Sequence, residues 1–244
     1  QNQNDLDYFE QFIIKNKNIL AGIFIEPLVQ CAGGMMFSSP DMLKAIFDIA
    51  KKHDVLFIAD ECAVGFYRTG KKFACDHANI SPDILIVGKA LTGGTMTLAA
   101  TLTSNQIFNS FLGKSLDLAL MHGPTFMGNA LACAAANASL DLFEKFDYEK
   151  KVLAQEKLMK KELEKVRQFN NVKDIRVLGS IGVVEIEADW PELVKLRKEF
   201  VSLGIFLRPF ANCIYIMPSF TMSKSDLLKI TNAIAKVYPN RPIY

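Results

Sequence analysis

Hydrophobic positions in the first part of the chain alternate between short continuous runs and longer amphipathic stretches. Short apolar runs bounded by Gly, Pro or Asp are typical of strands buried on both faces of a parallel sheet. Stretches with apolar residues three or four positions apart predict helices. This alternation indicates half of a doubly wound α/β sheet. We predict strands near 21–25, 55–59, 84–87 and 98–103 and helices near 6–13, 40–50 and 129–142.

The pattern changes after Phe146. A helix with one apolar stripe and a charged opposite face is followed by strands and helices that indicate an α+β module. We therefore place a domain boundary near residue 146, with residues 1–146 in part of a large domain and 147–244 in a small C-terminal domain. In this second part we predict strands near 172–178, 182–187, 205–208 and 213–217, and helices near 148–166, 193–203 and 223–237.

Two of the predicted strands end in side chains that carry chemistry. The run PDILIVGKALTGG places Lys89 directly after one strand, and FIADEC places Asp60 and Glu61 after another. The interval between the strands is long enough for a parallel crossover, and open α/β sheets build their sites at the carboxyl ends of such strands. We expect apolar neighbours to desolvate Lys89 and so favour its uncharged, nucleophilic amine.

An amine and a carboxylate placed in this way match the needs of pyridoxal phosphate. The lysine binds the aldehyde, and the carboxylate of Asp60 pairs with the pyridinium nitrogen, so that the ring withdraws electrons. The alternative for Lys89 is a solvated residue at a strand end, and the alternative for either acid is helix capping or a surface ion pair. We assign the structural role to Glu61.

Several longer segments resemble class III (fold type I) aminotransferases. They are IEPLVQCAGGM at 25–35, FIADECAVGFYRTGKKFACDHANISPDILIVGKALTGGTMTLAATLT at 57–103, MHGPTFMGNALACAAANASL at 121–140, VLGSIGVVE at 177–185 and LRPFANCIYIMP at 207–218. The resemblance implies the mostly parallel large-domain sheet of these enzymes plus the small domain. It also implies pyridoxal phosphate as cofactor and Lys89 as the catalytic residue.

The resemblance implies further site residues. Asp60, Lys89, Pro124 and Thr125 would bind the cofactor, with Thr125 reaching the phosphate held by the partner subunit of a homodimer with a shared active site. From the residues alone, the Gly123-Pro124-Thr125 turn before a helix start at Gly128 could bind an anion or simply cap the helix. Gly123, Arg208 and Tyr215 would bind substrate, Arg208 by gripping a carboxylate.

The narrower matches TGGTMTL, HGPTFMGN and RPF point to the branch of the class that serves biotin biosynthesis. Its substrates would be S-adenosylmethionine as amino donor and 8-amino-7-oxononanoate as acceptor. Ala32 stands where relatives acting on ornithine or γ-aminobutyrate usually have Glu, and Cys62 stands where Val or Ile usually packs against the ring. The alternatives are another class III ω-aminotransferase, or a catalytically silent folding or dimerisation module.

Composition narrows the partners. The net charge of +2 argues against a nucleic-acid or membrane partner, and no apolar stretch is as long as a membrane span. Five scattered cysteines without a C-x-x-C pair suit reduced thiols, and the pair Cys75 and His77 lacks the further ligands that a zinc site needs. We therefore expect a cytoplasmic protein without a metal.

The first residues pass directly from a short helix into a buried strand, which is typical of the middle of an α/β domain. In the resembled class, the preceding segment holds a Gly-Ser phosphate cup and the aromatic residue that stacks on the cofactor. We therefore expect the chain to be a fragment that lacks this N-terminal part.

Overall fold

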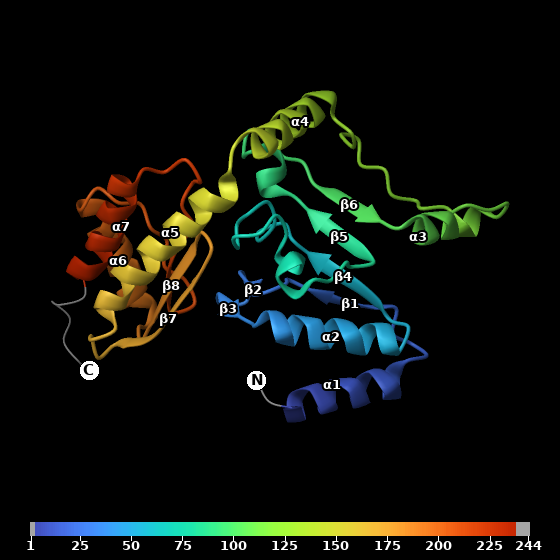
Figure 1. Cartoon of the computed structure of the whole chain (residues 1–244), viewed down its shortest axis with the longest axis horizontal. Coiled ribbons are helices and arrows are strands. Elements are labelled where there is room, and N and C mark those ends of the chain that lie inside the picture. The colour runs from blue at the N-terminus through green and yellow to red at the C-terminus, as the bar shows by residue number, and fades with distance from the viewer. Residues whose placement is uncertain (1–2, 238–244) are drawn as a thin grey trace. The chain divides into compact units, whose positions relative to one another are not determined.

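The computed structural model describes residues 3–237, and Figure 1 shows their helices and strands. The chain divides into two compact units. The first unit comprises Gln1–Leu28, Ser38–Phe66 and Phe73–Phe146, and the second comprises Val29–Phe37, Tyr67–Lys72 and Asp147–Tyr244. Two short segments from the first half of the chain therefore belong with the C-terminal unit.

The first unit is built on a four-stranded sheet in the order β1-β4-β5-β6 (Figure 1). β1, β4 and β5 are mutually parallel, whereas β6 pairs with β5 in the antiparallel direction. The sheet is thus mixed and mostly parallel, which confirms the α/β class inferred from the apolar runs. The strands are β1 (Gly22–Ile25), β4 (Leu56–Asp60), β5 (Ile84–Val87) and β6 (Ala100–Thr103).

Helix α2 illustrates how the sequence forms these elements. Ser39 accepts a hydrogen bond from the Met42 amide at 3.1 Å, and Pro40 occupies the first turn, where its missing N–H costs nothing. Phe47 packs edge-on against Phe57 of β4, with ring centroids 5.3 Å apart. The helices of this unit are α1 (Gln3–Asn16), α2 (Pro40–Lys52), α3 (Asn105–Ser110) and α4 (Ala130–Lys145), with 3-10 turns η1 (Ala74–Ala78), η2 (Lys89–Thr92) and η3 (Leu116–Leu118).

The second unit contains an antiparallel sheet in the order β7-β8-β9 and a separate two-stranded ladder, β2-β3. Buried side chains of β8 and β9 form one core with the apolar faces of α5, α6 and α7, centred on residues such as Phe200 and Ile234. The elements are β2 (Val29–Gln30), β3 (Met36–Phe37), α5 (Tyr148–Leu163), η4 (Glu164–Val166), β7 (Val172–Leu178), β8 (Ile181–Ile186), α6 (Trp190–Ser202), β9 (Cys213–Ile216) and α7 (Lys224–Val237).

Two expectations about local structure are wrong. Residues 205–208 form no strand, and the only ladder contact nearby is an isolated bridge between Phe210 and Cys213. Pro209 has no N–H to donate, and Ala211 and Asn212 both adopt positive φ, so the chain turns back before a ladder can form. The predicted helix start at Gly128 is also displaced, because α4 begins at Ala130.

Among the described residues, no helix is both long enough and apolar enough to cross a bilayer.

Candidate functional site

The carboxyl ends of β4 and β5 carry the predicted acid and amine. Asp60 is the last residue of β4 and lies opposite Ile86 in the parallel register, and the Glu61 amide donates to the Ile86 carbonyl at 2.8 Å. Lys89 follows β5 after the single residue Gly88. The parallel pairing therefore brings Asp60 and Lys89 to the same edge of the sheet, as the sequence predicted.

Asp60 and Lys89 both act on the pKa of the nearby Cys62 thiol. Its amide donates to Oδ1 of Asp60 at 3.0 Å, and its sulfur is in contact range of Gly88, where an added Cβ would lie 3.2 Å from Sγ. Partial burial and the Asp60 carboxylate raise the pKa of the Cys62 thiol to about 11, while Lys89 acts in the opposite direction. The thiol therefore stays protonated near neutral pH.

Lys89 is the first residue of the turn η2 and adopts a φ of 45°. A non-glycine residue in this left-handed region is strained, and such strain gathers at functional sites. The Lys89 residue is exposed, so the desolvation expected from its apolar neighbours is not provided by the residues described here. Within residues 3–237, the Lys89 side chain has no hydrogen bond or ion pair, which leaves its amine available to a ligand.

The turn that carries Lys89 packs against α4. Ser139, which is almost fully buried, donates its hydroxyl to the Ala90 carbonyl at 3.0 Å. The Thr92 hydroxyl donates to the Met96 carbonyl at 2.6 Å. Leu91 packs into a small core with Ala136 of α4. The sequence does not reveal these supports, because a serine within an alanine-rich helix gives no local sign of the backbone carbonyl to which it will donate.

Glu61 has the structural role assigned to it. Its side chain is fully buried and accepts hydrogen bonds from the amides of Ala74 at 2.6 Å and Cys75 at 2.8 Å, at the start of η1. Burial raises the pKa of the Glu61 carboxyl, although the two amides act to lower it. This acid therefore caps a 3-10 turn inside the protein, while its neighbour Asp60 remains half-buried at the edge of the sheet.

The predicted anion-binding turn is an exposed loop in this unit. Gly123, Pro124 and Thr125 are all exposed, and the Met127 amide donates to the Pro124 carbonyl at 2.9 Å. Thr125 does not cap α4. That role belongs to Asn129, whose side chain accepts from the amides of Leu131 at 3.0 Å and Ala132 at 3.1 Å.

Arg208 and Tyr215 lie in the second unit and line the same hollow, whose volume is about 240 Å³. Arg208 is exposed and has no hydrogen bond or ion pair with any described residue. Tyr215 lies on β9, where its ring meets Phe210 edge-on with centroids 5.3 Å apart. A guanidinium and a phenol on one hollow can bind a carboxylate together.

Among the described residues, no group of three or more His, Cys, Asp or Glu side chains is arranged to hold a metal ion. Cys75 is buried, and its thiol is surrounded by groups that raise its pKa, first through burial and then through Glu61. Such a thiol is a poor metal ligand, because the thiolate is the form that binds.

Comparison with known proteins gives consistent results. Residues 1–238 match the family described as "Aminotransferase class-III". An adenosylmethionine-8-amino-7-oxononanoate aminotransferase from Buchnera aphidicola subsp. Schizaphis graminum is 43% identical over 243 residues, which are 100% of this chain and 56% of the relative. The protein of the same name from Buchnera aphidicola subsp. Acyrthosiphon pisum is 45% identical over 95% of this chain and 54% of its own length.

Solved structures show the same similarity. The adenosylmethionine-8-amino-7-oxononanoate aminotransferase of Methanocaldococcus jannaschii superposes with a TM-score of 0.91 at 31% identity, covering 98% of this chain and 58% of that protein. An acetylornithine aminotransferase from Elizabethkingia anophelis gives a TM-score of 0.86, also at 31% identity, over 98% of this chain and 61% of its own. The chain thus spans little more than half the length of the curated relatives it matches.

Proposed function

Because this chain belongs to the class-III aminotransferase family, we propose that it supplies the lysine-bearing part of a pyridoxal-phosphate-dependent aminotransferase. The observation that carries the proposal is the meeting of an unpartnered amine, Lys89, and a half-buried carboxylate, Asp60, at the ends of two adjacent parallel strands. The proposed reaction moves the amino group of S-adenosylmethionine to 8-amino-7-oxononanoate and yields 7,8-diaminononanoate, a step of biotin biosynthesis. The names of the two Buchnera relatives support this choice of substrate.

The side chains at this edge of the sheet suit the cofactor. Oδ1 of Asp60 accepts from the Cys62 amide, and the half-buried carboxylate can also accept a hydrogen bond from the protonated ring nitrogen. The Lys89 amine can bind an aldehyde. We assign the cofactor phosphate to the hydroxyl of Thr125 and the backbone near Pro124, in a homodimer whose subunits share the site.

When bound, pyridoxal phosphate supplies an aldehyde and an electron-withdrawing ring. The protein's own groups then divide the work. Lys89 would hold the cofactor aldehyde, and its Nζ would act as the general base that takes the proton from the donor's Cα. Asp60 would pair with the ring nitrogen and favour its protonated form, which helps to stabilise negative charge at Cα. In the first unit, Gly123 is the residue predicted to contact the substrate.

We assign the carboxylate of 8-amino-7-oxononanoate to Arg208, assisted by Tyr215. The support is the hollow that these two residues line and the absence of any other partner for Arg208 among the described residues. Arg208→Lys keeps the charge but loses the two parallel hydrogen bonds of a guanidinium, so we expect the KM for the acceptor to rise by roughly tenfold. The KM for S-adenosylmethionine should remain nearly constant.

Trapping tests the assignment of Lys89. The chain is mixed with pyridoxal phosphate, reduced with borohydride, digested, and its peptides are analysed by mass spectrometry. We expect the pyridoxyl group on the peptide containing Lys89, and no such adduct in Lys89→Ala. Lys114→Ala is the matched control, because Lys114 is an exposed lysine of the same unit that no contact ties to this edge of the sheet. Equal labelling of all lysines would contradict the proposal.

Another class III ω-aminotransferase remains the second candidate, because the solved acetylornithine enzyme shares this fold and the same level of identity. The site at Lys89 would serve both reactions. Assays of the full-length protein with S-adenosylmethionine and with acetylornithine as donors separate the two candidates.

A cytoplasmic location is part of the same proposal and follows from the biosynthetic reaction. The domain boundary near residue 146 and the silent folding or dimerisation module remain predictions of the sequence.

A further inference from the structure

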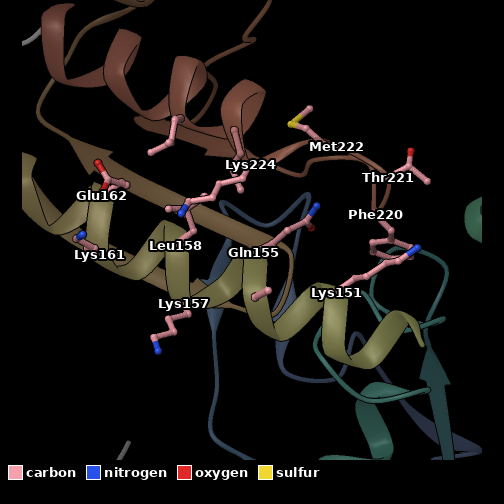
Figure 2. Close-up of a pocket in the computed structure, with 13 residues that line it drawn as sticks. Lys151, Gln155, Lys157, Leu158, Lys161, Glu162, Phe220, Thr221, Met222 and Lys224 are labelled. Atoms are coloured by element: carbon pink, nitrogen blue, oxygen red, sulfur yellow. The ribbon is translucent and has the colours of Figure 1, made fainter. Parts of the chain in front are cut away.

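A second hollow lies within the C-terminal unit, between α5 and the start of α7 (Figure 2). Its volume is about 700 Å³, which falls within the range of about 300–1,000 Å³ usual for small-molecule sites. The surfaces facing it are mainly apolar. They come from Leu158 of α5, from Met222, and from Leu227 and Leu228 of α7. All of these residues belong to one unit, so the hollow is defined by the unit itself.

The two buried polar side chains of this hollow, Gln155 and Glu162, are already bound to other residues. Gln155, which is almost fully buried, donates its amide to the Ser219 carbonyl at 2.9 Å and accepts from the Ser180 hydroxyl. The carboxylate of Glu162 is held by Lys165. A ligand in this interior therefore gains chiefly from burying apolar surface.

The rim of the hollow is basic. Four lysines line it, and its acidic residue, Glu162, is already paired with Lys165. Figure 2 shows Lys224 extending from the start of α7 toward Leu158 on α5, whereas Lys157 points away from the hollow. Lys224 is exposed and has no hydrogen bond or ion pair among residues 3–237. An uncompensated ammonium beside an apolar cavity favours a ligand with an anionic head.

We propose that this hollow binds a small amphipathic anion, a saturated monocarboxylate of medium chain length. Its methylene chain would lie between Leu158 and Leu228, and its carboxylate would meet the ammonium of Lys224. The ammonium of Lys224 is a compact point charge, which can pair with one carboxylate at the rim of the hollow. This binding is separate from the chemistry assigned to Lys89.

Isothermal titration of the purified chain with decanoate, kept below its micelle concentration, tests the proposal. We expect one saturable site, and affinity about fourfold higher for each methylene added between octanoate and decanoate. The neutral analogue decanamide should bind more weakly than decanoate. High salt should weaken decanoate binding but leave decanamide unchanged, because screening acts only on the charged pair.

Two variants place the site. Lys224→Glu should weaken decanoate binding by roughly five- to tenfold, since it replaces attraction by repulsion. The matched control is Lys198→Glu, which makes the same charge change at an exposed lysine of α6 outside the hollow and should leave the affinity unchanged. Ala154→Trp fills the hollow from an exposed position and should abolish binding of both decanoate and decanamide.

Circular dichroism confirms that each variant is folded before titration. The proposal is overturned if decanoate shows no saturable binding to the chain, or if it binds equally well to Lys224→Glu and Ala154→Trp. Equal weakening by Lys224→Glu and Lys198→Glu would also overturn it, because net charge rather than this hollow would then control binding. Tighter binding of decanamide than of decanoate would exclude the anionic head.

Discussion

The neighbouring acids Asp60 and Glu61 should respond in opposite ways to replacement. Glu61 is fully buried and satisfies two backbone amides, those of Ala74 and Cys75, whereas Asp60 is half-buried and accepts from one backbone amide, that of Cys62. We therefore predict that Glu61→Ala lowers the stability of the first unit. Asp60→Ala should instead leave the fold nearly intact and weaken binding of pyridoxal phosphate.

The magnitude follows from the contacts. Glu61→Ala leaves two buried N–H groups without an acceptor, at about 1–3 kcal/mol each. Removal of the desolvated carboxyl offsets part of this loss, because burial already raises the pKa of Glu61 and so disfavours its charged form. We expect a net loss of about 2–4 kcal/mol in the free energy of unfolding. Asp60→Ala removes one partly exposed hydrogen bond, and we expect a loss of about 0.5–1.5 kcal/mol.

Urea denaturation followed by circular dichroism measures both values, and absorbance after addition of pyridoxal phosphate measures cofactor binding. Glu61→Gln serves as an intermediate control, since its amide keeps one acceptor for one of the two N–H groups. The reasoning is refuted if Glu61→Ala unfolds at the same urea concentration as the unmodified chain. It is also refuted if Asp60→Ala is the less stable of the two variants.

Three further predictions concern stability. Burial raises the pKa of Glu61 above its ordinary 4.5, so its contribution is fully present below pH 4.5 and is lost as the pH rises through the folded pKa; the stability advantage over Glu61→Gln should shrink as the pH is raised above 4.5 in urea titrations. Gly179→Ala should cost about 2 kcal/mol or more in thermal unfolding, because φ is 54° and the new Cβ would lie 2.4 Å from the Arg68 carbonyl oxygen; an unchanged melting temperature would contradict this. Ser139→Ala should cost only about 0.5–1.5 kcal/mol in urea denaturation, because the Ala90 carbonyl still accepts from another amide, and a larger loss would show that the hydroxyl has a further role.

The sequence predicted the helices whose first residues carry clear capping signals. Ser39 and Pro40 marked the start of α2, and Ser223 with Asp226 marked the start of α7, where the Asp226 amide donates to the Ser223 hydroxyl at 3.1 Å. The expected strand at 205–208 failed because an apolar run becomes a strand only when a neighbouring edge can accept its hydrogen bonds. β9 pairs with β8 instead, and Pro209 lacks a donor.

The cap of α4 is a second feature that the sequence alone did not decide. The Gly123-Pro124-Thr125 turn was a candidate cap for this helix, yet Asn129 satisfies two amides of the first turn. Asparagine is a strong cap by propensity, so the sequence offered several solutions, and the folded chain uses Asn129.

The sequence by itself determined the α/β class with a mostly parallel sheet and the placement of Asp60 and Lys89 at one edge of that sheet, because both follow from apolar runs and from the geometry of parallel strands. Only the tertiary structure decided which of two adjacent acids is buried, and that Ser139 supports the turn bearing Lys89 from a distant helix. The position of Lys224 beside an apolar hollow also became clear only from the tertiary structure. These features depend on contacts between residues far apart in the chain, and the side-chain period along one element carries no information about what lies across from it.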